Sequence, residues 1–237
     1  MAAIAVTGAN RGIGAGIAVA LAERGFAVAC LTRSGCGPEG LDLPAWPVDV
    51  TDAAGLARAL DAAAEALGGL EGLVNNAGIH LQGTSAAFPV EDFARTMAVN
   101  TTAVFAAAQA VYPHLKANGG GIVVNLGSYW ERLGVRDNAA YCASKAAVSG
   151  LTRCLAVEWA RDNISVYTVA PGYVETDMNA GILANPRFRA WLKRRIPVGR
   201  PGRVDEVARF VALLFAEKIH YLTGETIVMD GAQSVNQ

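Results

Sequence analysis

Tyr141 and Lys145 stand four residues apart in Y-C-A-S-K, thirteen positions after Ser128. On a helix, this spacing places the phenol and the ammonium on one face, one turn apart. A free phenol titrates at about pH 10, and a nearby ammonium stabilises the phenolate and lowers the phenol's pKa. The Ser128 hydroxyl, which arrives from another element, can hold the oxygen that exchanges a proton with Tyr141. The three side chains predict ketone–alcohol chemistry that requires a separate hydride carrier.

A site for that carrier is indicated near the start of the sequence. A short apolar run typical of a buried parallel strand leads into T-G-A-N-R-G-I-G at 7–14 and then into a helical pattern. Glycines at positions 8, 12 and 14 leave room for the first N–H groups of the helix to approach a pyrophosphate, which the helix dipole favours. The spacing is G-x-x-x-G-x-G rather than the familiar G-x-G-x-x-G, and an ordinary turn would also contain such glycines.

Taken in order, these motifs resemble the short-chain dehydrogenase/reductase family in its compact, classical form, and the resemblance covers nearly the whole sequence. It rests on T-G-A-N-R-G-I-G at 7–14, D-V at 49–50, N-N-A-G at 75–78, Asn100, Ser128, Y-x-x-x-K at 141–145, P-G-Y-V-E-T at 171–176 and L-T-G-E-T at 222–226. The sub-group most similar in overall appearance is the β-ketoacyl-carrier-protein reductases.

The resemblance implies a role for each of four catalytic residues. Ser128 positions and polarises the substrate oxygen. Tyr141 donates a proton in reduction and accepts one in oxidation. Lys145 lowers the pKa of Tyr141 and holds the ribose hydroxyls of the nicotinamide half. Asn100 links the lysine to solvent through water, although an Asn in a helical pattern can also simply face solvent.

A larger set of residues is implied to bind the cofactor. These are Gly8, Asn10, Arg11, Gly12, Ile13, Gly14, Thr32, Arg33, Asp49, Val50, Asn76, Ala77, Gly78, Tyr141, Lys145, Pro171, Gly172, Val174 and Thr176. By the same resemblance, Asp49 and Val50 line the adenine, whereas the alternative for this stretch is a helix N-cap. Asn76 lies nearest the cofactor, and the 171–176 segment carries the nicotinamide carboxamide.

The choice between NADP and NAD depends on the end of the second predicted strand. An enzyme that uses NAD normally has a carboxylate there, but this sequence has Thr32 followed by Arg33, and Arg11 lies in the glycine loop. Two guanidinium groups can form charge-assisted hydrogen bonds to a 2′-phosphate. We expect NADP(H) to be preferred and NAD(H) to be possible, the alternative being two solvated arginines. Reduction is then the expected direction.

Apolar runs alternate with helical patterns along the whole sequence. Strands are predicted at 2–7, 26–31, 44–48, 70–75, 120–126, 163–169 and 225–229, and helices at 12–24, 52–67, 89–117, 138–160 and 203–216. This alternation predicts an α/β fold, a single-domain Rossmann-like doubly wound parallel β-sheet with helices on both faces. The stretch 35–40, rich in glycine, predicts a loop in place of one crossover helix. One domain is expected over 1–237.

Two regions are expected to shape the substrate site. Residues 177–200 are predicted to form a lid with apolar Met178, Ile182, Leu183, Phe188 and Trp191 and basic Arg187, Arg189, Lys193, Arg194 and Arg195. The basic residues either meet an acidic carrier or form a solvated helix face. After Ser128 the sequence reads Y-W-E-R at 129–132, where the sub-group has small or aliphatic residues. Two aromatics and an ion pair there are expected to reshape the pocket, so another ketone is as plausible as an acyl chain.

Composition limits the possible partners and location. The formal net charge of −1 gives no reason to expect nucleic acid or an anionic membrane. No apolar run approaches the roughly 20 residues of a membrane helix, and the first predicted strand starts at residue 2, so no signal peptide is expected. The four cysteines lack zinc-binding spacing, which predicts no metal site and buried thiols in a reducing cytoplasm. The resemblance implies a homotetramer that acts on a small carbonyl or alcohol, with acyl carrier protein as a possible partner. The alternatives are a catalytically idle NADP sensor and an interaction protein built on the helices at 99–117 and 138–160.

Overall fold

A seven-stranded parallel sheet forms the centre of the computed structural model, which describes residues 3–236 except for the Met178 side chain. The strands are β1 (Ala3–Thr7), β2 (Ala27–Thr32), β3 (Ala45–Pro47), β4 (Gly72–Asn75), β5 (Gly121–Leu126), β6 (Ile164–Pro171) and β7 (Thr226–Met229). Their order is β3-β2-β1-β4-β5-β6-β7. β1, β4 and β6 are buried along their whole length, because helices cover both faces of the sheet.

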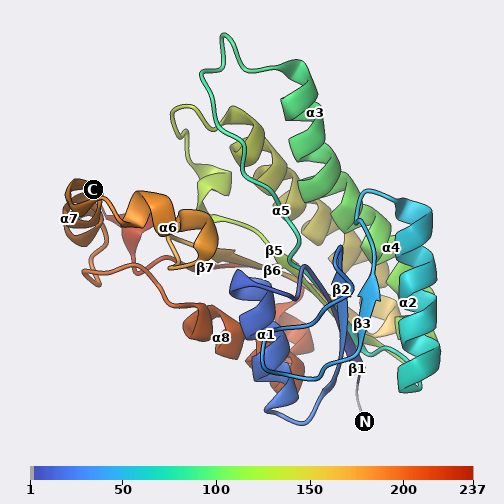
Figure 1. Cartoon of the computed structure of the whole chain (residues 1–237). Coiled ribbons are helices and arrows are strands. Elements are labelled where there is room, and N and C mark those ends of the chain that lie inside the picture. Colours follow the sequence, from blue (N-terminus) through green and yellow to red (C-terminus); the bar gives the residue numbers. More distant parts are fainter. Residues whose placement is uncertain (1–2, 237) are drawn as a thin grey trace.

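Helices lie on both faces of this sheet (Figure 1), and each face packs against them in a hydrophobic core. On one face, α1 (Gly12–Ala22) and α8 (Val204–Glu217) pack side by side and bury Ile17 and Phe215. On the other face lie α2 (Ala53–Leu67), α4 (Ala103–Ala117) and α5 (Ala139–Trp159). The predicted doubly wound α/β fold is confirmed, and most predicted boundaries lie within two residues of those observed.

The structure differs from the predicted elements in two places. The predicted helix 89–117 consists of α3 (Val90–Met97), a π-helical turn at Ala98–Thr102 and α4. The predicted lid contains two helices, α6 (Asp177–Leu183) and α7 (Pro186–Arg195), that the sequence patterns did not single out. The crossover between β2 and β3 is a loop, as predicted, and the predicted first strand begins with a residue outside the described range.

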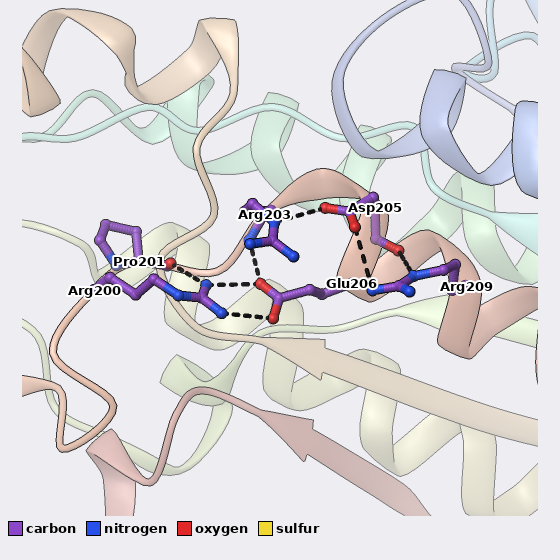
Figure 2. Close-up of polar contacts among 6 residues, drawn as sticks. All are labelled: Arg200, Pro201, Arg203, Asp205, Glu206 and Arg209. Atoms are coloured by element: carbon purple, nitrogen blue, oxygen red, sulfur yellow. Dashed lines mark hydrogen bonds and ion pairs between the residues drawn. The ribbon is translucent and has the colours of Figure 1, made fainter.

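The segment 177–200, which was predicted to form a lid, leaves and rejoins the fold at neighbouring points. Val174, before the segment, forms a parallel bridge with Gly202, after it. Glu206, in the first turn of α8, accepts hydrogen bonds from both terminal nitrogens of Arg200 and from the backbone N–H of Arg203 (Figure 2). These bonds hold the pKa of Glu206 down to about 2. The returning chain is therefore fixed at the start of α8.

Candidate active site

The four predicted catalytic residues lie at the carboxyl end of the sheet. Ser128 follows β5 and begins a short 3-10 helix at Tyr129–Arg132, where its Oγ accepts a hydrogen bond of 3.3 Å from the Trp130 N–H. Tyr141 and Lys145 share one face of α5. The Lys145 Nζ lies 5.7 Å from the centroid of the Tyr141 ring and donates a hydrogen bond of 2.7 Å to the Leu126 carbonyl. The predicted juxtaposition of serine, tyrosine and lysine is present.

Burial dominates the electrostatics of this cluster, in which Lys145 was expected to lower the pKa of Tyr141. Burial raises the pKa of Tyr141 to about 12, and the opposing contribution comes from the Ser128 hydroxyl. Burial also lowers the pKa of Lys145 to about 8. Burial is the largest influence on both groups, and the Lys145 ammonium is directed to the Leu126 carbonyl. Tyr141 therefore keeps its proton at neutral pH.

Asn100 is fully buried within the π-helical turn and does not face solvent. Its Oδ1 accepts from the Ile79 N–H at 2.9 Å, and its Nδ2 donates to the Ile79 carbonyl at 2.9 Å and to Ser144 Oγ at 3.1 Å. The side chain thus joins the loop after β4 to the helix that carries Tyr141. A Cβ atom on Gly78 would lie 3.3 Å from Asn100 Oδ1 and 3.8 Å from Lys145 Nζ, so this loop covers the catalytic lysine.

The glycine loop forms a cradle that side chains would fill. Gly8 and Gly12 have φ angles of 66° and 55°, in the left-handed region that favours glycine. A Cβ atom on Gly14 would overlap the Gly8 carbonyl oxygen and Asn76 Nδ2. Arg11 is the N-cap of α1 without a side-chain cap bond, and the first turn contains no acidic residue. The exposed N–H groups of this helix end fit a pyrophosphate.

Asn76 holds the glycine loop through hydrogen bonds to backbone carbonyl groups. Its Nδ2 donates to the carbonyl oxygens of Thr7 and Gly8 at 3.0 and 3.1 Å. The Thr7 hydroxyl in turn accepts from the backbone N–H groups of Asn76 and Ala77. These hydrogen bonds join the end of β1 to the end of β4 and fix the shape of the cradle.

The remaining predicted cofactor residues surround this cradle. The Thr32 hydroxyl is buried and closes a turn by bonding the N–H and carbonyl of Cys36 at 3.1 and 2.9 Å. Asp49 accepts two hydrogen bonds from Thr51, which lower its pKa, while Asp52 is the N-cap of α2. Three further residues of the set, Asn10, Arg11 and Arg33, are exposed, whereas Ile13 is half-buried, and Val50 and Ala77 line one shallow pocket.

The segment after β6 reaches the glycine loop from the other side. A Cβ atom on Gly12 would lie 3.8 Å from Thr176 Cγ2, which places Thr176 beside the start of α1. Gly172 packs tightly against Asp230 and donates a hydrogen bond of 2.9 Å to the Met229 carbonyl. Pro171 is the last residue of β6, and the buried Val174 forms the bridge at the base of the lid.

A row of aromatic rings extends from Tyr141 to the lid. This aromatic cluster consists of His80, Tyr129, Trp130, Tyr141, Tyr173, Phe188 and Trp191. Trp130 stands edge-on to Tyr141 with centroids 5.7 Å apart and meets Tyr173 at 6.0 Å. Phe188 and Trp191 stack at 5.4 Å on α7. The rings close one side of the site with apolar surface.

Only part of the Y-W-E-R stretch shapes the pocket as expected. Trp130 meets Tyr141, and the buried Tyr129 packs against Tyr173. The expected ion pair between Glu131 and Arg132 is present at 3.4 Å, but the Glu131 side chain is 3% exposed and accepts a hydrogen bond from Ser149 on α5. Glu131 fastens the serine-bearing turn to the tyrosine-bearing helix.

Two polar features of the site region were missed in the sequence. His80 follows the N-N-A-G-I stretch at 75–79, whose first residue is the last residue of β4. Open parallel sheets bind ligands at the carboxyl ends of their strands, so the position of His80 was a usable signal. A buried hydrogen-bonded chain connects Asn75, Asn125, Thr152 and Thr168. No sequence pattern indicated these contacts, because the partners lie on separate elements.

Within residues 3–236, no helix is long and apolar enough to cross a membrane. The described side chains also contain no group of three or more His, Cys, Asp or Glu residues arranged to hold a metal ion. All four cysteines are free. The expectation of buried thiols is wrong for Cys36 and Cys154, which are exposed, whereas Cys30 is buried and Cys142, next to Tyr141, is partly exposed.

Known proteins match this chain along almost its whole length. A family model described as enoyl-(acyl carrier protein) reductase matches residues 8–232. Gluconate 5-dehydrogenase of Gluconobacter oxydans (strain 621H) is 34% identical over 240 residues, with 98% of this chain and 94% of that protein covered. A 3-oxoacyl-[acyl-carrier-protein] reductase of Vibrio cholerae is 35% identical, with 95% and 94% covered.

Solved structures agree with this result. The crystal structure of a gluconate 5-dehydrogenase from Burkholderia cenocepacia J2315 in complex with NADP and tartrate superimposes with a TM-score of 0.91. It is 33% identical, and the match covers 100% of this chain and 96% of that one. The chain described here therefore belongs to the short-chain dehydrogenase/reductase family, and it is an NAD(P)-dependent oxidoreductase that acts on CH–OH groups.

Proposed function

We propose that this protein is an NADPH-dependent carbonyl reductase that converts a ketone into a secondary alcohol. The observation that carries the proposal is the cluster of Ser128, Tyr141 and Lys145 at the end of the glycine-lined cradle. When bound, the reduced nicotinamide supplies the hydride for the carbonyl carbon. The chain supplies the proton, the grip on the oxygen and the exclusion of water.

Each catalytic residue has a role that follows from its surroundings. Ser128 donates a hydrogen bond to the substrate oxygen and holds it against the Tyr141 hydroxyl. Tyr141, whose pKa is raised to about 12, retains its proton at neutral pH and is ready to give it to that oxygen, which suits reduction. Lys145, with its pKa lowered to about 8, is charged below that pH and stabilises the phenolate left by proton transfer. Asn100 holds Ile79 and Ser144 in place around the lysine.

The proposed preference for NADPH rests on the charges around the adenosine end of the cradle. Arg11 and Arg33 are exposed, and within residues 3–236 neither forms an ion pair with an acidic side chain. The position that bears a carboxylate in NAD enzymes is Thr32, whose hydroxyl is held by Cys36. The Asp49 carboxylate is near enough to Arg33 for the guanidinium to contribute to its lowered pKa, but it accepts its hydrogen bonds from Thr51, so both guanidinium groups are available to bind a 2′-phosphate.

Steady-state kinetics with a panel of ketones test both parts of this proposal. We expect turnover of ketones with NADPH. The kcat/KM for NADPH should be at least about tenfold that for NADH, because about one charge-assisted hydrogen bond to the 2′-phosphate is enough to produce that ratio. Arg33→Ala should reduce this ratio, and Arg153→Ala, which changes an exposed arginine on α5, is the matched control. A clear preference for NADH contradicts the cofactor assignment, and absence of turnover contradicts the proposed activity.

Two other substrate classes have specific support. An acyl carrier protein would meet the basic residues of the exposed face of α7, and the Vibrio cholerae relative acts on 3-oxoacyl carrier protein by its name. Among the alternatives of an NAD-dependent alcohol, sugar or steroid dehydrogenase, a sugar-type substrate is supported by the name of the Gluconobacter oxydans relative, gluconate 5-dehydrogenase. Acyl thioesters and sugar acids in the same panel separate these classes. A catalytically idle NADP sensor is disfavoured by the complete Ser-Tyr-Lys cluster, and the same turnover assay decides it.

The proposed assembly is a homotetramer in the cytoplasm. Two apolar side chains on the outer helices are exposed, Phe105 on α4 and Val157 on α5. Contacts between subunits would bury them. The four free cysteines suit a reducing compartment. Light scattering measures the assembly, and a monomer at micromolar concentration contradicts it. We also propose that α6 and α7 form the lid over the substrate.

A further inference from the structure

His80 is held in one orientation at the edge of the catalytic cluster. Its Nε2 lies 2.5 Å from Asn138 Oδ1, and Asn138 Nδ2 donates to the Arg136 carbonyl at 2.7 Å. The second contact fixes which end of the Asn138 amide faces His80, because a carbonyl accepts only from the NH2 group. Asn138 therefore presents an acceptor, and His80 must carry its proton on Nε2.

This tautomer leaves Nδ1 of a neutral His80 as a hydrogen-bond acceptor. Among the described residues, Nδ1 has no hydrogen-bond partner, whereas Nε2 is occupied. Asn138 is 6% exposed and is the N-cap residue of α5, so the imidazole is fixed relative to the helix that carries Tyr141. The chain thus provides a positioned acceptor that its own groups do not use.

The imidazole that carries this acceptor lies beside the Tyr141 ring. The His80 ring lies 4.8 Å from the Tyr141 ring and 5.7 Å from the Trp130 ring, measured between centroids. A carbonyl carbon whose oxygen is bound by Tyr141 brings its neighbouring carbon next to these rings. The aromatic cluster also contains the hydroxyls of Tyr129 and Tyr173 and the indole of Trp130, but these side chains interact with one another. His80 Nδ1 has no such partner among the described residues.

We infer that His80 recognises a hydroxyl group on the carbon next to the reacting one, so that the substrate is an α-hydroxy ketone or, in reverse, a vicinal diol. The inference rests on the proposed ketone reduction. A substrate hydroxyl donates to Nδ1 while the carbon chain lies against Trp130. A ketone without the hydroxyl displaces water from Nδ1 and leaves the nitrogen unpaired, which weakens binding of the transition state.

The test compares acetoin, which has a hydroxyl next to its carbonyl, with butanone, which has the same carbon chain without it. For the wild-type enzyme with NADPH, we expect kcat/KM for acetoin to exceed that for butanone by about tenfold to a hundredfold, the range for leaving one acceptor unpaired. The ratio of the two kcat/KM values is the quantity measured. General damage to the site lowers both values and so leaves their ratio unchanged.

Three variants identify the atom responsible. His80→Leu removes the acceptor and should bring the ratio to about one, whereas His80→Asn, whose Oδ1 takes the place of Nδ1, should keep part of it. His114→Leu is the matched control, since His114 pairs with Asp61 on the surface at 2.8 Å. If His80→Leu does not fold, as judged by circular dichroism, His80→Gln replaces it, because the Gln amide can donate to Asn138 as Nε2 does, while a CH2 group takes the position of Nδ1.

The outcomes separate the two claims. Equal kcat/KM for acetoin and butanone in the wild-type enzyme overturns the role of His80 and leaves ketone reduction standing. A preference for acetoin that persists in His80→Leu or His80→Gln also overturns it. If neither these ketones nor the wider panel is turned over with NADPH or NADH, the proposed function fails, and this inference fails with it.

Discussion

The cofactor side and the substrate side of this site are built by different interactions. On the cofactor side, Asn76 and Thr7 use hydrogen bonds to backbone groups to fix the glycine loop, and Asn100 does the same for the loop after β4. On the substrate side, Trp130 and the rings beyond it touch mainly through aromatic contacts. Trp191, at the far end of the aromatic cluster, is 41% exposed.

This contrast distinguishes the glycine loop, which tolerates few substitutions, from the aromatic cluster, which tolerates more. Backbone hydrogen bonds require particular side chains at particular places, since glycine or asparagine has no substitute there. Contacts between apolar rings tolerate other apolar residues of similar volume. In the proposed function, the glycine loop is compatible with many substrates, and the aromatic cluster is proposed to select among them. Four variants test this division, in order of decreasing expected effect.

The largest effect is expected from adding one methyl group to the glycine loop. Gly14→Ala places a Cβ atom against the Gly8 carbonyl and Asn76 Nδ2, and we expect the free energy of unfolding to fall by about 3 kcal/mol, with loss of NADPH binding. Gly181→Ala is the matched control in α6, where a Cβ atom meets no other atom within 4 Å, and it should be neutral or stabilising. Urea unfolding and NADPH titration measure both. Normal NADPH affinity in Gly14→Ala would show that the cradle is not required.

Lys145→Met is expected to raise the stability of the protein and to lower its activity. Lys145 is 6% exposed, and burial lowers its pKa from 10.5 to about 8, so the unfolded chain binds this proton more tightly between these pH values. Wild-type stability therefore rises with pH from about 8 to 10.5, as the buried charge is lost. We expect the variant to gain up to about 3 kcal/mol at pH 7 and to lose turnover about a hundredfold. A gain as large at pH 10 as at pH 7 contradicts the buried charge.

Trp130→Ala removes the centre of the aromatic cluster. Because Trp130 connects Tyr141 to Tyr173, we expect KM for the ketone to rise about tenfold or more, while the dissociation constant for NADPH changes little. Fluorescence titration with NADPH and initial-rate kinetics measure the two quantities. An equal loss of cofactor affinity would show that the two sides of the site are coupled.

Phe188→Leu should have the smallest effect. Phe188 stacks on Trp191 in α7, at the end of the aromatic cluster farthest from Tyr141 in the chain of contacts. We expect a change in ketone KM of about threefold or less, because Leu keeps most of the apolar surface. A larger change than that of Trp130→Ala would place the substrate against the lid instead of against Trp130.

The same division explains how far the sequence could be interpreted. The alternation of strands and helices predicted the doubly wound fold, and the glycine loop with Ser128, Tyr141 and Lys145 predicted the neighbours that the structure shows. These features depend on residue types at short, fixed spacings. The resemblance implied a helix distorted at Asn100, and the structure has a π-helical turn there, a form that the sequence patterns did not specify.

The substrate side was less accessible to prediction. Its rings come from the loop after β4, the turn after β5, the segment after β6 and α7, and their contacts follow only from the tertiary fold. The effect of Lys145 on the pKa of Tyr141 stays a prediction, and the rise of this pKa through burial was not anticipated, because spacing indicates a nearby charge but not the burial around it. The orientation of Glu131 toward Ser149 was likewise invisible, since neighbouring residues of a turn point in different directions.

The most direct test of the central claim is the turnover of Tyr141→Phe together with its affinity for NADPH. The variant keeps the ring packed against Trp130 and His80 and removes only the hydroxyl that carries the proton. The account predicts a fall in kcat of about a thousandfold, within the range for removal of a general acid, with an NADPH dissociation constant within about threefold of wild type. A variant that keeps nearly wild-type kcat contradicts the assignment of Tyr141 as the proton donor.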